Sequence, residues 1–246
     1  MSRTEQKVAV VTGASRGIGA AIATRLASDG FAVVINYAGN AAEAEALAGR
    51  IEKGGGRALS SRADVSDPQV VKRMFDAAED ALGGVDVLVN NAGIMRLATL
   101  AESDDALIES QLSVNLKGSL HTMREAARRL RPGGRIVNLS SSVVGLYQPT
   151  YGVYAATKAA IEAMTHVLAK ELRGRNVTVN AVAPGPTATA LFLDGKPQAV
   201  VDQLAKLAPL ERLGQPEDIA SVVAFLAGPD GSWVNGQVLR ANGGIV

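Results

Sequence analysis

Short apolar runs alternate with longer segments of helical periodicity along almost the whole chain. Seven runs have the length and composition of strands: Lys7–Thr12, Ala32–Tyr37, Arg57–Ala63, Val85–Asn91, Gly134–Ser141, Val177–Ala183 and Gly236–Arg240. Six segments have the spacing of helices with an apolar face: Gly17–Ser28, Ala41–Lys53, Pro68–Leu82, Ser103–Leu130, Tyr154–Leu172 and Pro216–Ala227. This alternation is typical of repeated β-α-β units.

We therefore predict an α/β fold, a doubly wound (Rossmann) parallel sheet of seven strands with helices on both faces. No long linker, low-complexity tract or internal repeat divides the 246 residues, so we predict one domain over residues 1–246. Hydrophobic residues make up 47% of the chain and aromatic residues only 4%. A core built from Ala, Val, Leu and Ile suits a buried parallel sheet.

Composition excludes several classes of function. The 25 basic and 24 acidic side chains nearly cancel and form no run of like charge, which argues against nucleic-acid and membrane partners. The absence of cysteine excludes disulfides, thiolate catalysis and cysteine-ligated metals. His121 and His166 stand apart from any ligand cluster, so no metal site is predicted. The opening MSRTEQK is not a signal segment, and we expect a cytoplasmic protein.

A glycine-rich turn follows the first predicted strand and precedes the first predicted helix. Its spacing is G-x-x-x-G-x-G. Glycines in such a turn let backbone N–H groups at the helix start approach a pyrophosphate. A plain strand-to-helix turn is the alternative, but it needs fewer glycines. We predict that this turn binds a dinucleotide through Gly13, Ser15, Arg16, Gly17, Ile18 and Gly19.

A second group of residues suits proton transfer to a carbonyl oxygen. Tyr154 and Lys158 are four residues apart on one helix face, and Ser141 lies thirteen residues before Tyr154. We expect the Lys158 ammonium, helped by an oxidised nicotinamide ring, to lower the pKa of the Tyr154 phenol. The alternative is an exposed tyrosine beside a solvated lysine. In parallel sheets, ligands bind at the carboxyl ends of the strands, where these residues and the glycine turn are predicted to meet.

Five motifs together resemble the short-chain dehydrogenase/reductase family. They are TGASRGIG (12–19), NNAG (90–93), Ser141, YAATK (154–158) and the Pro-Gly pair at 184–185. The pattern is most similar to 3-oxoacyl-(acyl-carrier-protein) reductases. The resemblance implies that Tyr154 is the general acid/base, Ser141 holds the substrate oxygen, and Lys158 binds the nicotinamide ribose and assists Tyr154.

The resemblance also implies that Asn115 holds a water molecule that links the lysine to solvent. Three adjacent serines could supply the catalytic hydroxyl, and we select Ser141. On a strand it would point away from Ser140 and Ser142, and its distance in sequence from Tyr154 matches the family. Ser142 remains the second candidate.

The second predicted strand indicates the cofactor. It ends in Asn36, Tyr37 and Ala38, without the carboxylate that NAD-dependent proteins use to bind the adenosine ribose. In the resembling NADP-dependent proteins, an arginine at the place of Arg16 reaches the 2′-phosphate and Ser15 adds a hydrogen bond. Arg16 as a plain surface charge is the alternative. We predict NADP(H).

Further cofactor contacts are implied by the resemblance. Asp64 and Val65 would meet the adenine, although Asp64 could instead cap the next helix, for which Ser66 and Asp67 are nearer. The remaining contacts lie under the adenosine ribose and the nicotinamide carboxamide: Asn91, Ala92, Gly93, Pro184, Gly185, Thr187 and Thr189. Thr187 stands where a β-branched aliphatic residue is usual, so the role of its side chain is open.

We predict an NADPH-dependent oxidoreductase that reduces a ketone or a 3-oxoacyl thioester. The alternatives are an alcohol or sugar dehydrogenase working oxidatively and a non-catalytic NADP-sensing regulator. Residues 190–214 are expected to form a substrate lid. Its apolar lining would be Leu191, Phe192, Leu193, Val200 and Leu207, with Lys196 and Lys206 at the mouth. Tyr151 suits the pocket or the surface equally.

Partners follow from the resemblance. The segments 103–130 and 154–172 form a subunit interface in the family, so a homotetramer is expected, although burial against the sheet would explain part of the same pattern. Arg131 and Arg175 could contact an acidic acyl carrier protein, but solvated arginines at helix ends are the interpretation that we favour.

Overall fold

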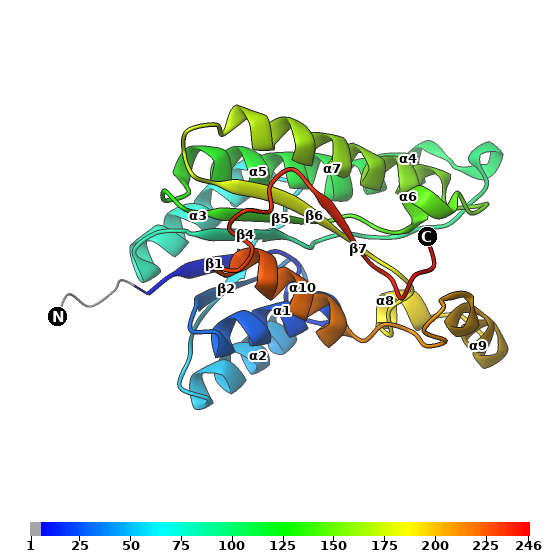
Figure 1. Cartoon of the computed structure of the whole chain (residues 1–246), viewed down its shortest axis with the longest axis horizontal. Helices are drawn as coiled ribbons and strands as arrows, with labels where there is room; N and C mark the ends of the chain where they lie inside the picture. Colours follow the sequence, from blue (N-terminus) through cyan, green and yellow to red (C-terminus); the bar gives the residue numbers. More distant parts are fainter. Residues whose placement is uncertain (1–5) are drawn as a thin grey trace.

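The computed structural model describes residues 6–246, in which seven strands form one parallel sheet in the order β3-β2-β1-β4-β5-β6-β7 (Figure 1). Most of the MSRTEQK segment lies outside the described residues. The strands are β1 (Val8–Val11), β2 (Ala32–Tyr37), β3 (Arg57–Arg62), β4 (Val87–Asn90), β5 (Arg135–Leu139), β6 (Thr178–Pro184) and β7 (Val238–Ala241). Strand order reverses between β1 and β4, which opens a crevice at their carboxyl ends.

Helices cover both faces of the sheet (Figure 1). On one face lie α1 (Gly17–Ser28), α2 (Ala41–Lys53) and α10 (Pro216–Ala227). On the other lie α3 (Pro68–Leu82), α4 (Asp105–Gln111), α5 (Gly118–Arg129) and α7 (Gly152–Glu171). Short helices occupy the loops: η1 (Leu100–Glu102), α6 (Val143–Leu146), α8 (Ala190–Leu193) and α9 (Gln198–Leu207). The predicted fold class is confirmed.

Two apolar cores hold these layers together. Alternate residues of one strand point to opposite faces, so Val10 packs toward α3 and α5 while Val11 packs toward α1 and α10. Phe75 of α3 is buried in the core that contains Val10, and Leu26 of α1 is buried in the core that contains Val11. Because both faces are covered, the central strands are apolar throughout. The sheet is thus a rigid platform for the loops at its carboxyl edge.

The segment 103–130 differs from the single helix that its pattern predicts. It consists of α4, a π-helical turn η2 (Leu112–Lys117) and α5. Apolar periodicity continues through the π turn, so the pattern alone cannot locate it. Such turns occur frequently at functional sites, and this one contains Asn115. Within residues 6–246, no helix has the length and apolar character needed to span a bilayer.

Candidate active site

Two adjoining pockets lie at the carboxyl edge of the sheet and contain the predicted site residues. The first is lined by the glycine turn and the ends of β2, β3 and β4. The second is lined by the loop after β5, the start of α7, the loop after β6 and the helices α8 and α9. Ile18, Asn91, Gly93 and Thr189 line both pockets, so the two form one continuous cleft. This juxtaposition is the one that the sequence predicts.

The glycine turn has the shape of a phosphate cradle. Gly13 has a φ of +60°, and a Cβ there would lie 2.9 Å from the Cα of Ala92. A Cβ on Gly19 would lie 2.4 Å from the Gly13 carbonyl oxygen and 2.5 Å from Asn91 Nδ2. Only glycine allows the backbone to pass this close and still start α1 at Gly17. The exposed helix N-terminus in this cleft fits a pyrophosphate.

Thr12 and Asn91 join the glycine turn to the end of β4. The Thr12 Oγ1 accepts hydrogen bonds from the backbone N–H groups of Asn91 at 2.9 Å and Ala92 at 3.0 Å. Asn91 Nδ2 in turn donates to the carbonyl oxygens of Thr12 at 2.9 Å and Gly13 at 3.0 Å. These reciprocal bonds fix the floor of the cleft. Thr12 belongs to the TGASRGIG motif, yet sequence reasoning gave it no role.

Asn36 supports the glycine turn from below. Its side chain is buried; Oδ1 accepts from Gly13 N at 3.1 Å, and Nδ2 donates to the Ala63 carbonyl oxygen at 2.9 Å. Its amide is therefore used within the protein, although the residue also lines the cleft as predicted. Tyr37 and Ala38 line the cleft beside it, and Arg16 also lines it and is exposed. A cation without a neighbouring carboxylate is the expected environment of a 2′-phosphate.

Asp64 and Val65 line the end of the cleft where the adenine is expected. Asp64 Oδ1 accepts from the backbone N–H of Ser66 at 2.9 Å and from its hydroxyl at 2.7 Å. The cap of α3 is Asp67, which was the nearer candidate. Val65 is buried, and its carbonyl oxygen lies 3.0 Å from His121 Nδ1. His121 thus helps to hold this wall.

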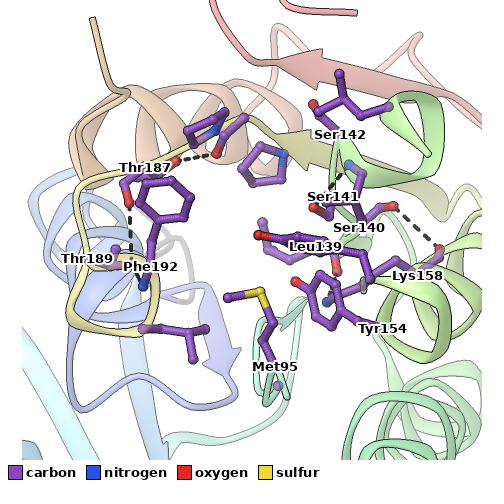
Figure 2. Close-up of a pocket in the computed structure, with 18 of the residues that line it drawn as sticks. Met95, Leu139, Ser140, Ser141, Ser142, Tyr154, Lys158, Thr187, Thr189 and Phe192 are labelled. Atoms are coloured by element: carbon purple, nitrogen blue, oxygen red, sulfur yellow. Dashed lines mark hydrogen bonds between the residues drawn. The ribbon is translucent and has the colours of Figure 1, made fainter. Parts of the chain in front are cut away.

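The three adjacent serines after β5 point in alternating directions. Ser140 Oγ donates to Glu162 Oε1 at 2.7 Å, and Ser142 Oγ donates to the Ala183 carbonyl oxygen at 3.1 Å. Both hydroxyls are thereby used within the protein. Ser141 instead hydrogen-bonds Tyr154, and Figure 2 shows it facing the pocket. The geometry selects Ser141 over Ser142. The serines follow β5 in a loop, because β5 ends at Leu139.

Tyr154 and Lys158 lie on one face of α7, as their spacing predicts. Lys158 is buried; its Nζ donates to the Leu139 carbonyl oxygen at 2.7 Å and lies 5.7 Å from the centre of the Tyr154 ring. A Cβ added to Gly93 would lie 3.8 Å from this Nζ. Lys158 therefore stands where the two pockets join. Tyr154 is half-buried by area because its ring also lines the open pocket.

The expected acidification of Tyr154 by Lys158 is wrong for the protein's own groups. Burial raises the pKa of Tyr154 to about 12, while the hydrogen bond from Ser141 acts in the opposite direction and Tyr151 raises it further. Burial also lowers the pKa of Lys158 to about 8. Lys158 is not among the groups that lower the pKa of Tyr154, and its ammonium is directed at the Leu139 carbonyl. The phenol is consequently protonated at neutral pH.

The side chain of Asn115 is committed to the loop after β4. Its Oδ1 accepts from Ile94 N at 2.8 Å, and its Nδ2 donates to the Ile94 carbonyl oxygen at 2.9 Å and to Thr157 Oγ1 at 3.3 Å. Asn115 thereby connects η2, the Gly93 loop and α7. Its water-holding role stays a prediction.

The second pocket has a mainly apolar lining (Figure 2). Tyr151 belongs to it, with its ring 6.5 Å from that of Tyr154 at 64°. Of the predicted lid residues, Leu191, Phe192 and Leu207 line the pocket. Leu193 and Val200 are not among its lining residues, which instead include the unpredicted Leu204.

The turn after β6 joins the cofactor cleft to the lid. Pro184, Gly185, Thr187 and Thr189 all line the second pocket, Thr189 also lines the dinucleotide cleft, and their contacts with the cofactor stay a prediction. Thr187 Oγ1 donates to the Gly185 carbonyl oxygen at 2.9 Å, which gives its open side chain a structural role. Thr189 Oγ1 accepts from Phe192 N at 3.3 Å and caps α8. The position of Phe192 thus depends on a predicted cofactor residue.

Arg131 and Arg175 lie away from this cleft, and neither is simply solvated. Arg131 makes a bidentate ion pair with Asp86, with distances of 2.6 and 3.0 Å, just before β4 begins. Arg175 donates to the carbonyl oxygens of Ala127 and Leu130 near the end of α5. These positions adjoin the amino ends of the strands, opposite the site. The geometry gives no support to carrier recognition by these two arginines.

Sequence reasoning also missed a buried polar chain beneath the site. Thr122 of α5 hydrogen-bonds Asn90, Asn90 donates to Asn138 at 2.8 Å, and Asn138 donates to Thr165 of α7 at 2.9 Å. These bonds tie both helices to β4 and β5, directly before the site loops. Glu162 was missed too, although its place four residues after Lys158 on the same helix was a usable signal.

Comparisons with known proteins place the whole fold among related sequences and structures. Residues 13–246 match the family model described as enoyl-(acyl carrier protein) reductase. The chain is 48% identical over 250 residues to a short-chain type dehydrogenase/reductase of Picea abies, covering 98% of this chain and 92% of the relative. It is 46% identical over 254 residues to an NADPH-dependent aldehyde reductase-like protein, chloroplastic, of Arabidopsis thaliana, covering 98% and 94%. A short-chain dehydrogenase of Burkholderia cenocepacia J2315, solved in complex with NADP, superposes with a TM-score of 0.93 at 40% identity over 99% of each chain.

Proposed function

Since the chain belongs to the short-chain dehydrogenase/reductase family and is an NADP(H)-dependent enzyme, we propose that it reduces the carbonyl group of a small molecule to an alcohol. Ketones, aldehydes and 3-oxoacyl thioesters are the candidate substrates. The observation that carries this proposal is the convergence of Ser141, Tyr154 and Lys158 at the junction of the dinucleotide cleft and the apolar pocket.

Tyr154 is the general acid of the proposed reaction. Bound NADPH supplies a hydride for the carbonyl carbon. The Tyr154 hydroxyl donates its proton to the carbonyl oxygen, and Ser141 holds the same oxygen by a hydrogen bond. Because the pKa of Tyr154 is about 12, the phenol carries the proton that reduction requires. The oxidative alternative would run the same steps in reverse, with Tyr154 accepting the proton.

Lys158 has a positioning role next to Tyr154 and Ser141. Its ammonium bonds the Leu139 carbonyl, which fixes the strand end that leads into Ser141. We assign it the nicotinamide ribose as its second partner. The cofactor's pyrophosphate would lie on the glycine turn, its 2′-phosphate beside Arg16, and its adenine beside Asp64 and Val65.

The site argues against a regulator that only senses NADP. Such a protein would not need Tyr154, Ser141 and Lys158 arranged around a pocket of their own. For the assembly, we propose a homotetramer with an interface formed by α5 and α7. In support, Leu120 and Val167 are exposed large apolar side chains on these helices. A molecular mass measured in solution would test it. We also propose a cytoplasmic location.

Tyr154→Phe tests the function directly. The substitution removes the proton donor but keeps the ring, so turnover should fall by roughly 10²–10⁴-fold. NADPH affinity, measured by fluorescence titration, should be almost unchanged. NADPH oxidation would be followed with a panel of ketones, aldehydes, acetoacetyl thioesters and quinones. A phenylalanine variant that keeps most of its activity would refute the assignment, and a panel without any turnover would favour the regulator.

A further inference from the structure

The inner wall of the substrate pocket is apolar and firmly held. Leu139 ends β5, Leu146 lies on α6, and Tyr151 immediately precedes α7. Thr150, just before Tyr151, has a φ of +72°, which is unfavourable for a β-branched residue. Its carbonyl oxygen accepts from Ala98 N at 3.1 Å, so the loop after β4 holds this conformation. The surrounding structure therefore keeps the Tyr151 ring at the pocket.

The opposite wall is apolar as well. Figure 2 shows Phe192 and Met95 directed into the space that Tyr154 and Ser141 face from the other side. Leu204 of α9 continues this wall. Lys196 of the lid is engaged elsewhere: its ammonium donates to the Phe192 carbonyl oxygen and lies 4.6 Å from the centre of the Phe192 ring.

The pocket offers a charged substrate almost no partner. Among the described residues that line it, the ionisable side chains are Tyr151, Tyr154 and Lys158. Burial raises the pKa of both phenols, so both are neutral at physiological pH. Lys158 already donates to the Leu139 carbonyl and serves the reacting end of the pocket. No arginine, histidine or carboxylate lines the pocket within residues 6–246.

A carboxylate or phosphate placed in this pocket would lose its hydration without gaining a counter-charge. An apolar ring or chain would instead replace water along both walls. Building on the proposed carbonyl reduction, we infer that the substrate is an uncharged carbonyl compound whose apolar body packs between Phe192 and Tyr151. Carbonyl compounds that carry an anionic group next to this body are excluded.

A matched pair of ligands tests this inference. Methyl 4-acetylbenzoate and 4-acetylbenzoate share one aryl ketone and differ by a negative charge. Their affinities for the NADP⁺-loaded enzyme would be measured by calorimetry, which does not require turnover. The ester should bind at least about 100-fold more tightly than the acid, since an unpaired buried charge costs at least two decades of affinity. Equal binding, tighter binding of the acid, or saturation by neither would overturn the inference.

Variants of Gln148 make the test specific. Gln148 lines the pocket and is exposed, so its replacement does not disturb the core. Gln148→Arg should raise the affinity for the acid at least tenfold, whereas Gln148→Met, an uncharged control, should leave the preference for the ester intact. A Gln148→Arg variant that still rejects the acid as strongly as the wild type would count against the inference. NADPH consumption is a separate readout: an ester that binds but is not reduced would refute the proposed function and leave the substrate class standing.

Discussion

Replacing Lys158 with Met should reveal how much stability this residue costs the fold. Met keeps a long, flexible apolar side chain but removes the ammonium. Burial lowers the pKa of Lys158 from its ordinary 10.5 to about 8. At about 1.36 kcal/mol per pKa unit, this shift corresponds to about 3 kcal/mol. The folded protein therefore bears an unfavourable buried charge at neutral pH.

The pH dependence has a definite sign. In the unfolded chain the lysine keeps its proton up to about pH 10.4, whereas in the folded chain Lys158 releases it near pH 8. Between these values the unfolded chain binds more protons, so the free energy of unfolding rises with pH. The opposite shift of Tyr154 operates between about pH 10 and 12, above this window. The Met variant lacks the lysine contribution altogether.

The free energy of unfolding of the wild type, relative to that of Lys158→Met, should therefore increase by about 2–3 kcal/mol from pH 7 to pH 10. At pH 7 the two proteins should be close in stability. Relief from the buried charge is then offset by about 1–3 kcal/mol for a Leu139 carbonyl left without its hydrogen bond.

Urea unfolding followed by circular dichroism at pH 7 and pH 10 measures this difference. Lys170→Met is a matched control, because Lys170 lies on the same helix but is exposed. Its difference from the wild type should not change over this range. If the Lys158→Met difference also stayed constant within about 1 kcal/mol, Lys158 would not bear the burial penalty argued above.

Three further predictions concern the cofactor cleft. Gly19→Ala should weaken NADPH binding and destabilise the fold by about 1–3 kcal/mol, because its Cβ would lie 2.4 Å from the Gly13 carbonyl oxygen and 2.5 Å from Asn91 Nδ2. Calorimetry measures both effects. An affinity equal to that of the wild type would contradict phosphate binding by the glycine turn. Arg16→Ala should lower kcat/KM with NADPH about tenfold, which corresponds to about 1.4 kcal/mol. The kcat/KM with NADH should not change. Ala38→Asp should shift the cofactor preference further toward NADH. If the ratio of kcat/KM with NADPH to kcat/KM with NADH stayed unchanged in both variants, the 2′-phosphate would have to bind elsewhere.

Local signals were sufficient for much of the fold. The bounds of α1, α2, α3 and α10 agree with those expected from apolar periodicity and caps. For α3, the cap Asp67 is followed by Pro68, and Gly83 at the other end adopts a left-handed conformation. Each of these signals lies within a few residues of the boundary that it sets.

The site residues divide in the same way. Spacing alone placed Tyr154 and Lys158 on one face of α7, and the glycines of residues 13–19 indicated a phosphate-binding turn. The choice of Ser141 over Ser142, however, rests in the structure on the bonds of Ser140 and Ser142 with α7 and β6, which are distant in sequence. The pocket position of Tyr151 likewise depends on the loop after β4.

The amino-acid sequence by itself indicated the order of strands and helices, the cofactor class and the candidate reacting groups, because these predictions depend on short-range periodicity, turn residues and motif spacing. Tertiary structure alone decided the π turn at Asn115, the internal use of the Asn36 amide, and the directions in which burial moves the pKa values of Tyr154 and Lys158. Solvation of a side chain depends on every element packed around it, and segments far apart along the chain contribute those elements.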